Sequence, residues 1–460
     1  MAASDMSVTP YWEVTFDADG DVDTGQRDRL LDGVVRRGVV DLVVFAHGWN
    51  SDRSGATGLY SRFFAPFPAL APSARLGYVG VLWPSMRFSD EPIPDYRPVP
   101  ALAPARPALD KRTRHALLEV FPGRATLVEQ LARLLEQRPD ESASLEEFGR
   151  LVRLLVEVPP QGPQGAFTAD TLAEGVPEGT PGMLCGETAG VCAEFAAALA
   201  EVAASADAAA DAVAGASLAA SATGPSAVMT GAAVPGPQVW DGAHELLRQA
   251  TYFAMKRRAG TVGERGLGRL LGQLAERAPD VRVHLVGHSF GARLVSFALR
   301  GLPRGVRTVK SATLLQAAFS HYAFAARLPH DPRASGVLNG QQKRVDGPLV
   351  CCHSRHDSAL GTIYPLASRM AGDARTVRGL SVNSLLGAKW GALGYDGIKA
   401  VKGTLSFPLS AALAGRLPAS GCVNVDASAV VRRGGAPSGA HSDICHQELA
   451  RIVLAAGRVV

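Results

Sequence analysis

The chain has 460 residues, of which 47% are hydrophobic and 20% are charged, which is enough for a large core in one to three domains. Its 47 basic and 43 acidic residues leave a formal net charge of +4, and no basic run is interleaved with aromatic residues, which argues against nucleic acid as the main partner. The six cysteines form neither a dense disulfide pattern nor a C-x-x-C motif.

The most apolar segments predict neither a secretory signal nor a transmembrane helix. Met1–Tyr11 lacks a basic stretch followed by an apolar one. Val191–Val234 is rich in alanine rather than leucine or isoleucine, and it is interrupted by Glu194, Glu201 and Asp207. We therefore expect a soluble, cytoplasmic protein without a transmembrane segment.

The first 85 residues predict alternating strands and helices. The expected elements are strands at 11–16, 39–46 and 77–83 and helices at 27–37 and 59–71. Asp17-Ala-Asp-Gly-Asp21 is interpreted as a hairpin turn, because its glycine is misplaced for a calcium loop and no glutamate closes one. Strand, helix and strand in this order are typical of a parallel sheet with crossover helices.

The strand over 39–46 runs directly into His47-Gly48-Trp49-Asn50-Ser51. A strand that ends in His-Gly is one place where backbone N–H groups can face a developing oxyanion. An ordinary turn between strand and loop is the alternative interpretation.

The regular alternation stops at Met86 and returns near Trp240. Residues 126–137 carry leucine and valine at helical spacing, and Ser144-x-x-Glu147 predicts a capping box that opens a second amphipathic helix. Proline-rich, loop-like and alanine-rich stretches occupy 90–108, 159–182 and 193–222. We interpret 86–239 as a large, mainly helical cap with an alanine-rich, partly disordered segment; an inert spacer is the alternative.

Two helices are expected between Trp240 and the next strand. Asp241 is placed to cap the first, which is expected to stop near Gly260, and leucines from 267 to 274 mark the second. The intervening Gly263-x-x-Gly266-x-Gly268 lacks the ending of a phosphate loop and follows no strand, so we do not interpret it as one.

The most informative sequence is Gly287-His-Ser-Phe-Gly291. It lies between the β-branched run 281–286, which predicts a buried strand, and residues 292–300, which predict a helix. In a G-x-S-x-G at such a turn the serine adopts a strained backbone conformation that exposes its hydroxyl, and the glycines allow close approach of neighbouring backbone. Ser289 is therefore predicted to be a nucleophile.

The C-terminal third supplies an acid and a base for this serine. Further strands are expected at 309–317, 348–352 and 421–427. A carboxylate just past a late strand is where an acid that orients histidine lies, which favours Asp357, with Asp426 as the alternative. His441 precedes a helix expected over 444–454 and is favoured as the base over His446, which falls inside that helix.

Ser289, Asp357 and His441 occur in the chain order expected of an α/β-hydrolase. The chain is similar to the lipase- and esterase-like members of the α/β-hydrolase superfamily. The similarity lies in the sequences Phe45–Trp49, Val286–Gly291, Ser354–Asp357 and His441–Asp443. It covers about 1–85 and 240–460, the expected catalytic domain, and it does not cover 86–239.

The resemblance implies an α/β-hydrolase fold: a mostly parallel sheet with helices on both faces and a large, mainly helical insertion. By the same resemblance, Ser289 is the nucleophile and His441 the general base and then acid. Asp357 holds the histidine tautomer, and the N–H groups of Trp49 and Phe290 supply the oxyanion hole.

The implied activity is hydrolysis of a carboxylic ester, small or lipid-like, through an acyl-enzyme and without a cofactor. No metal is expected, because His353-x-x-His356 lacks a third ligand. The alternatives are an amidase, peptidase or acyltransferase with the same triad, and a non-catalytic binding protein on a hydrolase frame. The sequence leaves the acyl chain and the oligomeric state open.

Four further residues have structural interpretations. His288 is expected to pack along the turn, and His47 is expected to shape the loop after its strand. Cys351 and Cys352 are expected to be core thiols on opposite faces of a strand.

Overall fold

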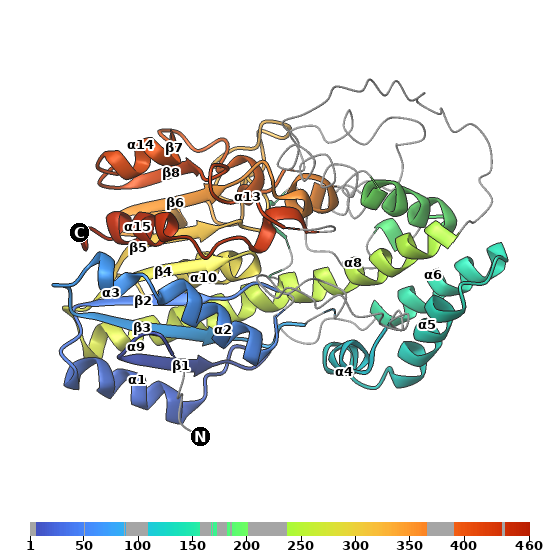
Figure 1. Cartoon of the computed structure of the whole chain (residues 1–460), viewed down its shortest axis with the longest axis horizontal. Coiled ribbons are helices and arrows are strands. Elements are labelled where there is room, and N and C mark those ends of the chain that lie inside the picture. Colours follow the sequence, from blue (N-terminus) through green and yellow to red (C-terminus); the bar gives the residue numbers. More distant parts are fainter. Residues whose placement is uncertain are drawn as a thin grey trace, which may run out of the picture.

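The computed structural model of the chain contains one sheet, with α4 (Lys111–Val120), α5 (Ala125–Gln137) and α6 (Ser142–Val156) to one side of it (Figure 1). The structure describes residues 6–49, 51–86, 88, 109–156, 167, 169–172, 182–184, 186–200, 237–365, 391–434 and 438–460. The expectations for 90–108, for most of 159–182 and for 201–222 fall outside these residues.

All eight strands that the structure describes belong to this sheet, and every neighbouring pair is parallel. The strands are β1 (Tyr11–Thr15), β2 (Asp41–Ala46), β3 (Leu76–Leu82), β4 (Arg282–His288), β5 (Val309–Leu315), β6 (Pro348–His353), β7 (Leu405–Pro408) and β8 (Gly421–Asp426). Their order is β1-β3-β2-β4-β5-β6-β8-β7. The predicted α/β class is confirmed, because parallel neighbours are joined by crossovers that pack on the sheet.

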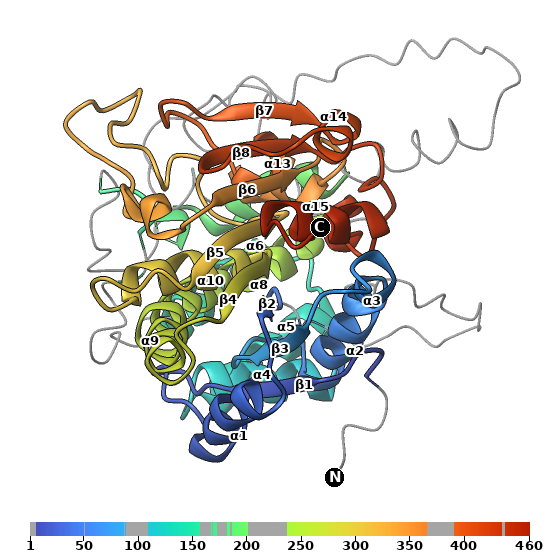
Figure 2. The same ribbon diagram turned by 90° about the vertical axis from the view of Figure 1, so that its left-hand side faces the viewer.

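Helices cover both faces of the sheet. They are α1 (Thr24–Arg36), α2 (Arg53–Phe64), α3 (Phe67–Leu70), α4 (Lys111–Val120), α5 (Ala125–Gln137), α6 (Ser142–Val156), α8 (Pro237–Thr261), α9 (Gly268–Arg277), α10 (Phe290–Gly301), α13 (Leu393–Asp396), α14 (Leu409–Ala414) and α15 (Gln447–Ala456). Short helices are η2 (Gly182–Leu184), η3 (Val262–Leu267), η4 (Gln341–Arg344), η5 (Ala359–Ile363) and η6 (Gly439–Ser442). One core joins α1, α8, α9 and α10 to the sheet, and a second core joins α2, α3, α14 and α15 to the opposite face (Figure 2).

Aspartate caps start two helices earlier than expected. α1 begins at Thr24 because the Asp23 side chain accepts a hydrogen bond from the N–H of Gln26 at 2.8 Å. α2 begins at Arg53 after the equivalent cap, Asp52. The single helix expected over 59–71 is divided near Pro66 into α2 and α3.

α8 ends at Thr261, one residue past the expected stop at Gly260, but the chain stays helical beyond this point. It continues through the π-helical η3 into α9, and Asp241 lies inside α8, where it pairs with Arg138 at 2.8 Å. A Cβ added to Gly263 would lie 2.2 Å from the carbonyl oxygen of Leu294 on α10. The glycine is therefore needed for close packing of two helices and does not end one.

The segment between β3 and α8 contains more helix than expected. α5 lies where the leucine spacing predicts it, but α4 was not predicted, and α6 begins at Ser142, so Ser144 opens no capping box. α4, α5 and α6 all contact α8, and they lie beyond the edge at which the strands end (Figure 1). Among the described residues, no helix has the length and apolar character needed to cross a membrane.

Candidate active site

The backbone at Ser289 has an unusual conformation. Ser289 has φ 55° and ψ −121° between β4 and α10, a region that side-chain-bearing residues occupy at a cost of about 1–3 kcal/mol. A Cβ on Gly287 would lie 2.4 Å from the carbonyl oxygen of Gly291, and one on Gly291 would lie 2.0 Å from that of Ala46. A side chain at either glycine would therefore clash with the neighbouring backbone. The N–H of Ser289 donates a hydrogen bond to the carbonyl oxygen of Leu315 on β5 at 3.0 Å.

Ser289, His441 and Asp357 form one chain of hydrogen bonds. Nε2 of His441 lies 2.9 Å from Oγ of Ser289, and Nδ1 of His441 lies 2.7 Å from Oδ2 of Asp357. Asp357 is fully buried, Ser289 is nearly so, and the His441 side chain is 14% exposed. The carboxylate is thus shielded from solvent, and the imidazole links it to the Ser289 hydroxyl.

Asp426 and His446, the alternative acid and base, make other contacts. Asp426 Oδ1 accepts the N–H of Ser428 at 2.9 Å, at the end of β8. His446 Nε2 lies 2.9 Å from Asp443 Oδ1, and this hydrogen bond raises the pKa of His446. The expectation that His446 lies inside a helix is wrong by one residue, because α15 begins at Gln447 and His446 is its N-cap.

Burial is the largest influence on the Asp357 carboxyl, and it raises the pKa of that group. The nearby His441 and the N–H of Leu360, which donates to Oδ1 at 3.0 Å, favour the ionised form and oppose the effect. A buried carboxylate that already accepts two hydrogen bonds can stabilise an imidazolium without reaching solvent.

The loop after β2 packs directly against the serine. A Cβ on Gly48 would lie 2.8 Å from Cβ of Ser289, so only glycine fits there. The Trp49 and Phe290 rings stack with centroids 5.8 Å apart and an interplanar angle of 14°. Phe290 is the first residue of α10, so its N–H has no acceptor within the helix. Both expected oxyanion donors therefore belong to segments that adjoin Ser289.

Two side chains that the sequence did not single out hold this loop. The N–H of His47 donates to Oη of Tyr60 at 3.0 Å, and Nε1 of Trp83 donates to the His47 carbonyl oxygen at 2.9 Å. The His47 and Trp83 rings also stack at 5.6 Å. His47 is buried and its Nδ1 lies 2.8 Å from the carbonyl oxygen of Gly48, as expected for a residue that shapes the loop.

His288 does more than pack along the turn. Its Nε2 lies 2.8 Å from the carbonyl oxygen of His441, and because a carbonyl can only accept, Nε2 carries the proton. The two rings lie 5.1 Å apart. The residue before the serine therefore fixes the backbone of the histidine that contacts the serine.

We expect the folded state to lose stability as the pH falls below about 6.5, where unfolded histidines titrate. Burial lowers the pKa of His47 to about 4 and that of His288 to about 3. Between those values and 6.5 the unfolded chain binds more protons than the folded one, so each histidine costs roughly 1.4 kcal/mol of stability per pH unit. Denaturant unfolding at about pH 7.5 and about pH 5 measures the loss.

The control is His115→Gln, because the His115 side chain is 77% exposed. It should leave the pH dependence unchanged, whereas His288→Asn should reduce it. An unfolding midpoint that does not move between the two pH values would contradict the neutral burial of His47 and His288.

Aromatic residues from four segments line one side of the site. Tyr252 of α8 lies 5.0 Å from Phe290 and 5.9 Å from Trp49, measured between ring centroids. Tyr364, just after η5, lies 6.1 Å from Tyr252. We call Trp49, Tyr252, Phe290 and Tyr364 the aromatic wall. No periodic pattern in the sequence predicts it, because its members are far apart in the chain.

The residues that the structure describes include no group of side chains suited to holding a metal ion. No three His, Cys, Asp or Glu side chains come together there in a suitable arrangement. Cys351 and Cys352 are both buried, one in each core, as expected from strand alternation. Burial raises the pKa of both thiols, which keeps them protonated.

The functional assignment depends on this geometry alone. Comparison of the chain with protein-family models, with curated proteins and with solved structures finds no match.

Proposed function

We propose that the protein is a serine hydrolase of the α/β-hydrolase type that cleaves a carboxylic ester. The observation that carries the proposal is the hydrogen-bond chain from Asp357 through His441 to Ser289, with Ser289 in a strained turn between a strand and a helix. A serine hydroxyl is too weakly acidic to attack unaided, and this arrangement supplies an adjacent base with a buried acid behind it.

In the proposed reaction, Oγ of Ser289 attacks the ester carbonyl carbon while Nε2 of His441 takes the hydroxyl proton. The imidazolium then gives this proton to the departing alkoxide oxygen, which leaves as an alcohol, and the acyl group remains on Oγ. Water, deprotonated by His441, releases the acid and restores Ser289. The N–H groups of Trp49 and Phe290 stabilise the negative oxygen in both tetrahedral intermediates.

The segment 86–239 is proposed to act as a cap. α4, α5 and α6 pack on α8, and α8 also supplies Tyr252 of the aromatic wall. An apolar wall beside the nucleophile suits a small apolar or lipid-like acyl group. The cap and α8 together would therefore shape the substrate pocket.

Reaction with a fluorophosphonate probe, followed by mapping of the modified residue, tests the proposal. We expect stoichiometric labelling at Ser289 and turnover of nitrophenyl esters, with a preference among acyl chains. A matched panel of anilides separates ester hydrolysis from amide hydrolysis. Absence of both labelling and turnover would contradict catalysis and favour a non-catalytic binding protein.

A further inference from the structure

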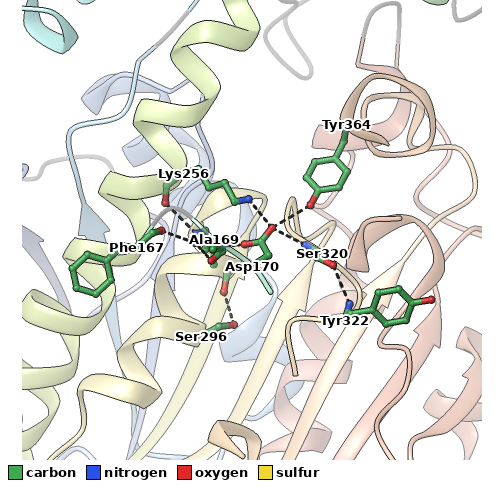
Figure 3. Close-up of polar contacts among 10 residues, drawn as sticks. Phe167, Ala169, Asp170, Lys256, Ser296, Ser320, Tyr322 and Tyr364 are labelled. Carbon is green, nitrogen blue, oxygen red and sulfur yellow. Dashed lines mark hydrogen bonds and ion pairs between the residues drawn. The ribbon is translucent and has the colours of Figure 1, made fainter. Parts of the chain in front are cut away.

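A cluster of charged side chains is buried behind the aromatic wall. Asp170, Arg293 and Lys256 are 0%, 0% and 5% exposed, respectively. Arg293 Nη1 pairs with Oδ1 of Asp170, and Lys256 Nζ lies 3.0 Å from Oδ2. The same Oδ2 accepts the N–H of Ser320 at 3.1 Å and the hydroxyl of Tyr364 at 3.2 Å (Figure 3).

Arg293 also fixes the backbone around Asp170. Its Nη2 donates to the carbonyl oxygens of Phe167 and Ala169 at 2.7 Å and 3.1 Å, and its Nε donates to that of Lys256 at 3.0 Å. On the other side, the carbonyl oxygen of Asp170 accepts the N–H of Val337 at 3.0 Å. Phe167, Ala169 and Asp170, which belong to the segment interpreted as an insertion, are therefore built into the core of the sheet domain.

The charges of the cluster make it sensitive to the loss of Asp170. Two cations and one carboxylate are held away from solvent, and removing one partner of a buried ion pair leaves a charge that water cannot reach. Asp170 is the carboxylate that both Lys256 and Arg293 contact. Formation of the cluster therefore requires Asp170 to be in place.

The cluster also reaches two segments that carry members of the triad. Arg293 lies on α10, one helical turn after Ser289. Tyr364 follows η5, the short helix that begins two residues after Asp357. Asp170 thus connects the helix of the nucleophile to the loop of the acid, and the Tyr364 ring also belongs to the aromatic wall.

We propose that Asp170 is a positioning residue: through Arg293 and Tyr364 it sets the acid loop relative to the nucleophile helix, so that the segment 86–239 contributes to the geometry of the triad. The inference rests on the proposed function of Ser289, His441 and Asp357. It assigns to Asp170 no contact with the substrate.

This positioning role changes the expected result of removing the cap. An inert spacer or an independent cap could be replaced over about 90–238 by a short linker without loss of Ser289 reactivity. Such a replacement would delete Asp170 and leave Lys256 and Arg293 buried without it. We therefore expect the protein with this linker to be less stable and its Ser289 to be less reactive.

The decisive variant is Tyr364→Phe, which keeps the ring and removes only the hydroxyl that donates to Asp170. We expect kcat per titrated active site to fall about tenfold with KM within about twofold, because small displacements of catalytic groups are costly. The acidic limb of kcat/KM should move to lower pH, because a displaced Asp357 stabilises the His441 imidazolium less. His288, also in contact with His441, stays neutral and does not contribute to this limb.

A second readout does not depend on hydrolysis. The Nδ1 proton of His441, hydrogen-bonded to Asp357 at 2.7 Å, should give a far-downfield NMR resonance that disappears in His441→Ala. We expect Tyr364→Phe to shift or broaden this resonance, whether or not any ester is a substrate. If the proposed function is wrong but the positioning role is right, turnover will be absent while Tyr364→Phe still changes the resonance.

Tyr322→Phe is the matched control, since Tyr322 joins the neighbouring Ser320 through its backbone N–H. It should leave kcat, the acidic limb of the kcat/KM profile and the His441 resonance unchanged. Asp170→Asn should lower Tm by about 3 to 5 °C, but this loss alone would be consistent with a structural role. The positioning role would be overturned if Tyr364→Phe left kcat, the acidic limb of the kcat/KM profile and the His441 resonance unchanged.

Discussion

Ser289→Ala is expected to abolish ester hydrolysis and fluorophosphonate labelling while leaving the protein folded. The hydroxyl makes the covalent bond in the proposed reaction, and no other group of the triad can replace it. We expect the rate to fall by at least about 10⁴-fold, toward what the oxyanion donors alone provide. Initial rates with a nitrophenyl ester measure the loss, and circular dichroism and Tm establish that the variant is folded.

Ser296→Ala is the matched control for this variant. Ser296 is buried on α10, the helix that follows Ser289, and its hydroxyl donates to the carbonyl oxygen of Ala292 at 2.7 Å. It should keep full labelling and turnover. Normal turnover in Ser289→Ala would end the assignment of the nucleophile.

The second large effect is expected at the base. His441→Ala should lower kcat by at least about 10³-fold, because Ser289 then has no group to take its proton. In the unaltered protein the rate should rise with pH over the range in which a histidine base loses its proton. A rate that is flat from about pH 5 to 9 would count against any histidine base.

His446→Ala should cost little activity, since His446 contacts Asp443 and caps α15. A small loss of stability is the expected effect of removing that pair. If His446→Ala were inactive and His441→Ala active, the base would have to be reassigned and the acid with it.

Strand patterning was predictable because it is local. β2, β3 and β4 are short apolar runs rich in β-branched residues, and a strand buried on both faces needs such a run. Their boundaries lie within two residues of the expected ones. β7 was not predicted, because it lies at the sheet edge and its residues are partly or fully exposed, so it has no buried pattern.

Helix boundaries were less predictable because distant contacts override local signals. Glycine usually marks the end of a helix, yet Gly263 and Gly268 lie inside a continuous helical segment. An added Cβ on Gly268 would lie 2.7 Å from the carbonyl oxygen of Ala298 on α10. Glycine at these positions reflects a neighbouring helix, which the sequence does not reveal.

By itself the sequence determined the parallel α/β framework and the turn that carries Ser289, because both follow from residues that are adjacent in the chain. It also named His441 and Asp357 with one alternative each. Only the tertiary structure brings His441 and Asp357 to Ser289, because hydrogen bonds of 2.9 Å and 2.7 Å join residues 152 and 84 positions apart. Asp170 had no signal in the sequence for the same reason: its partners come from four distant segments, and only folding brings them to one carboxylate.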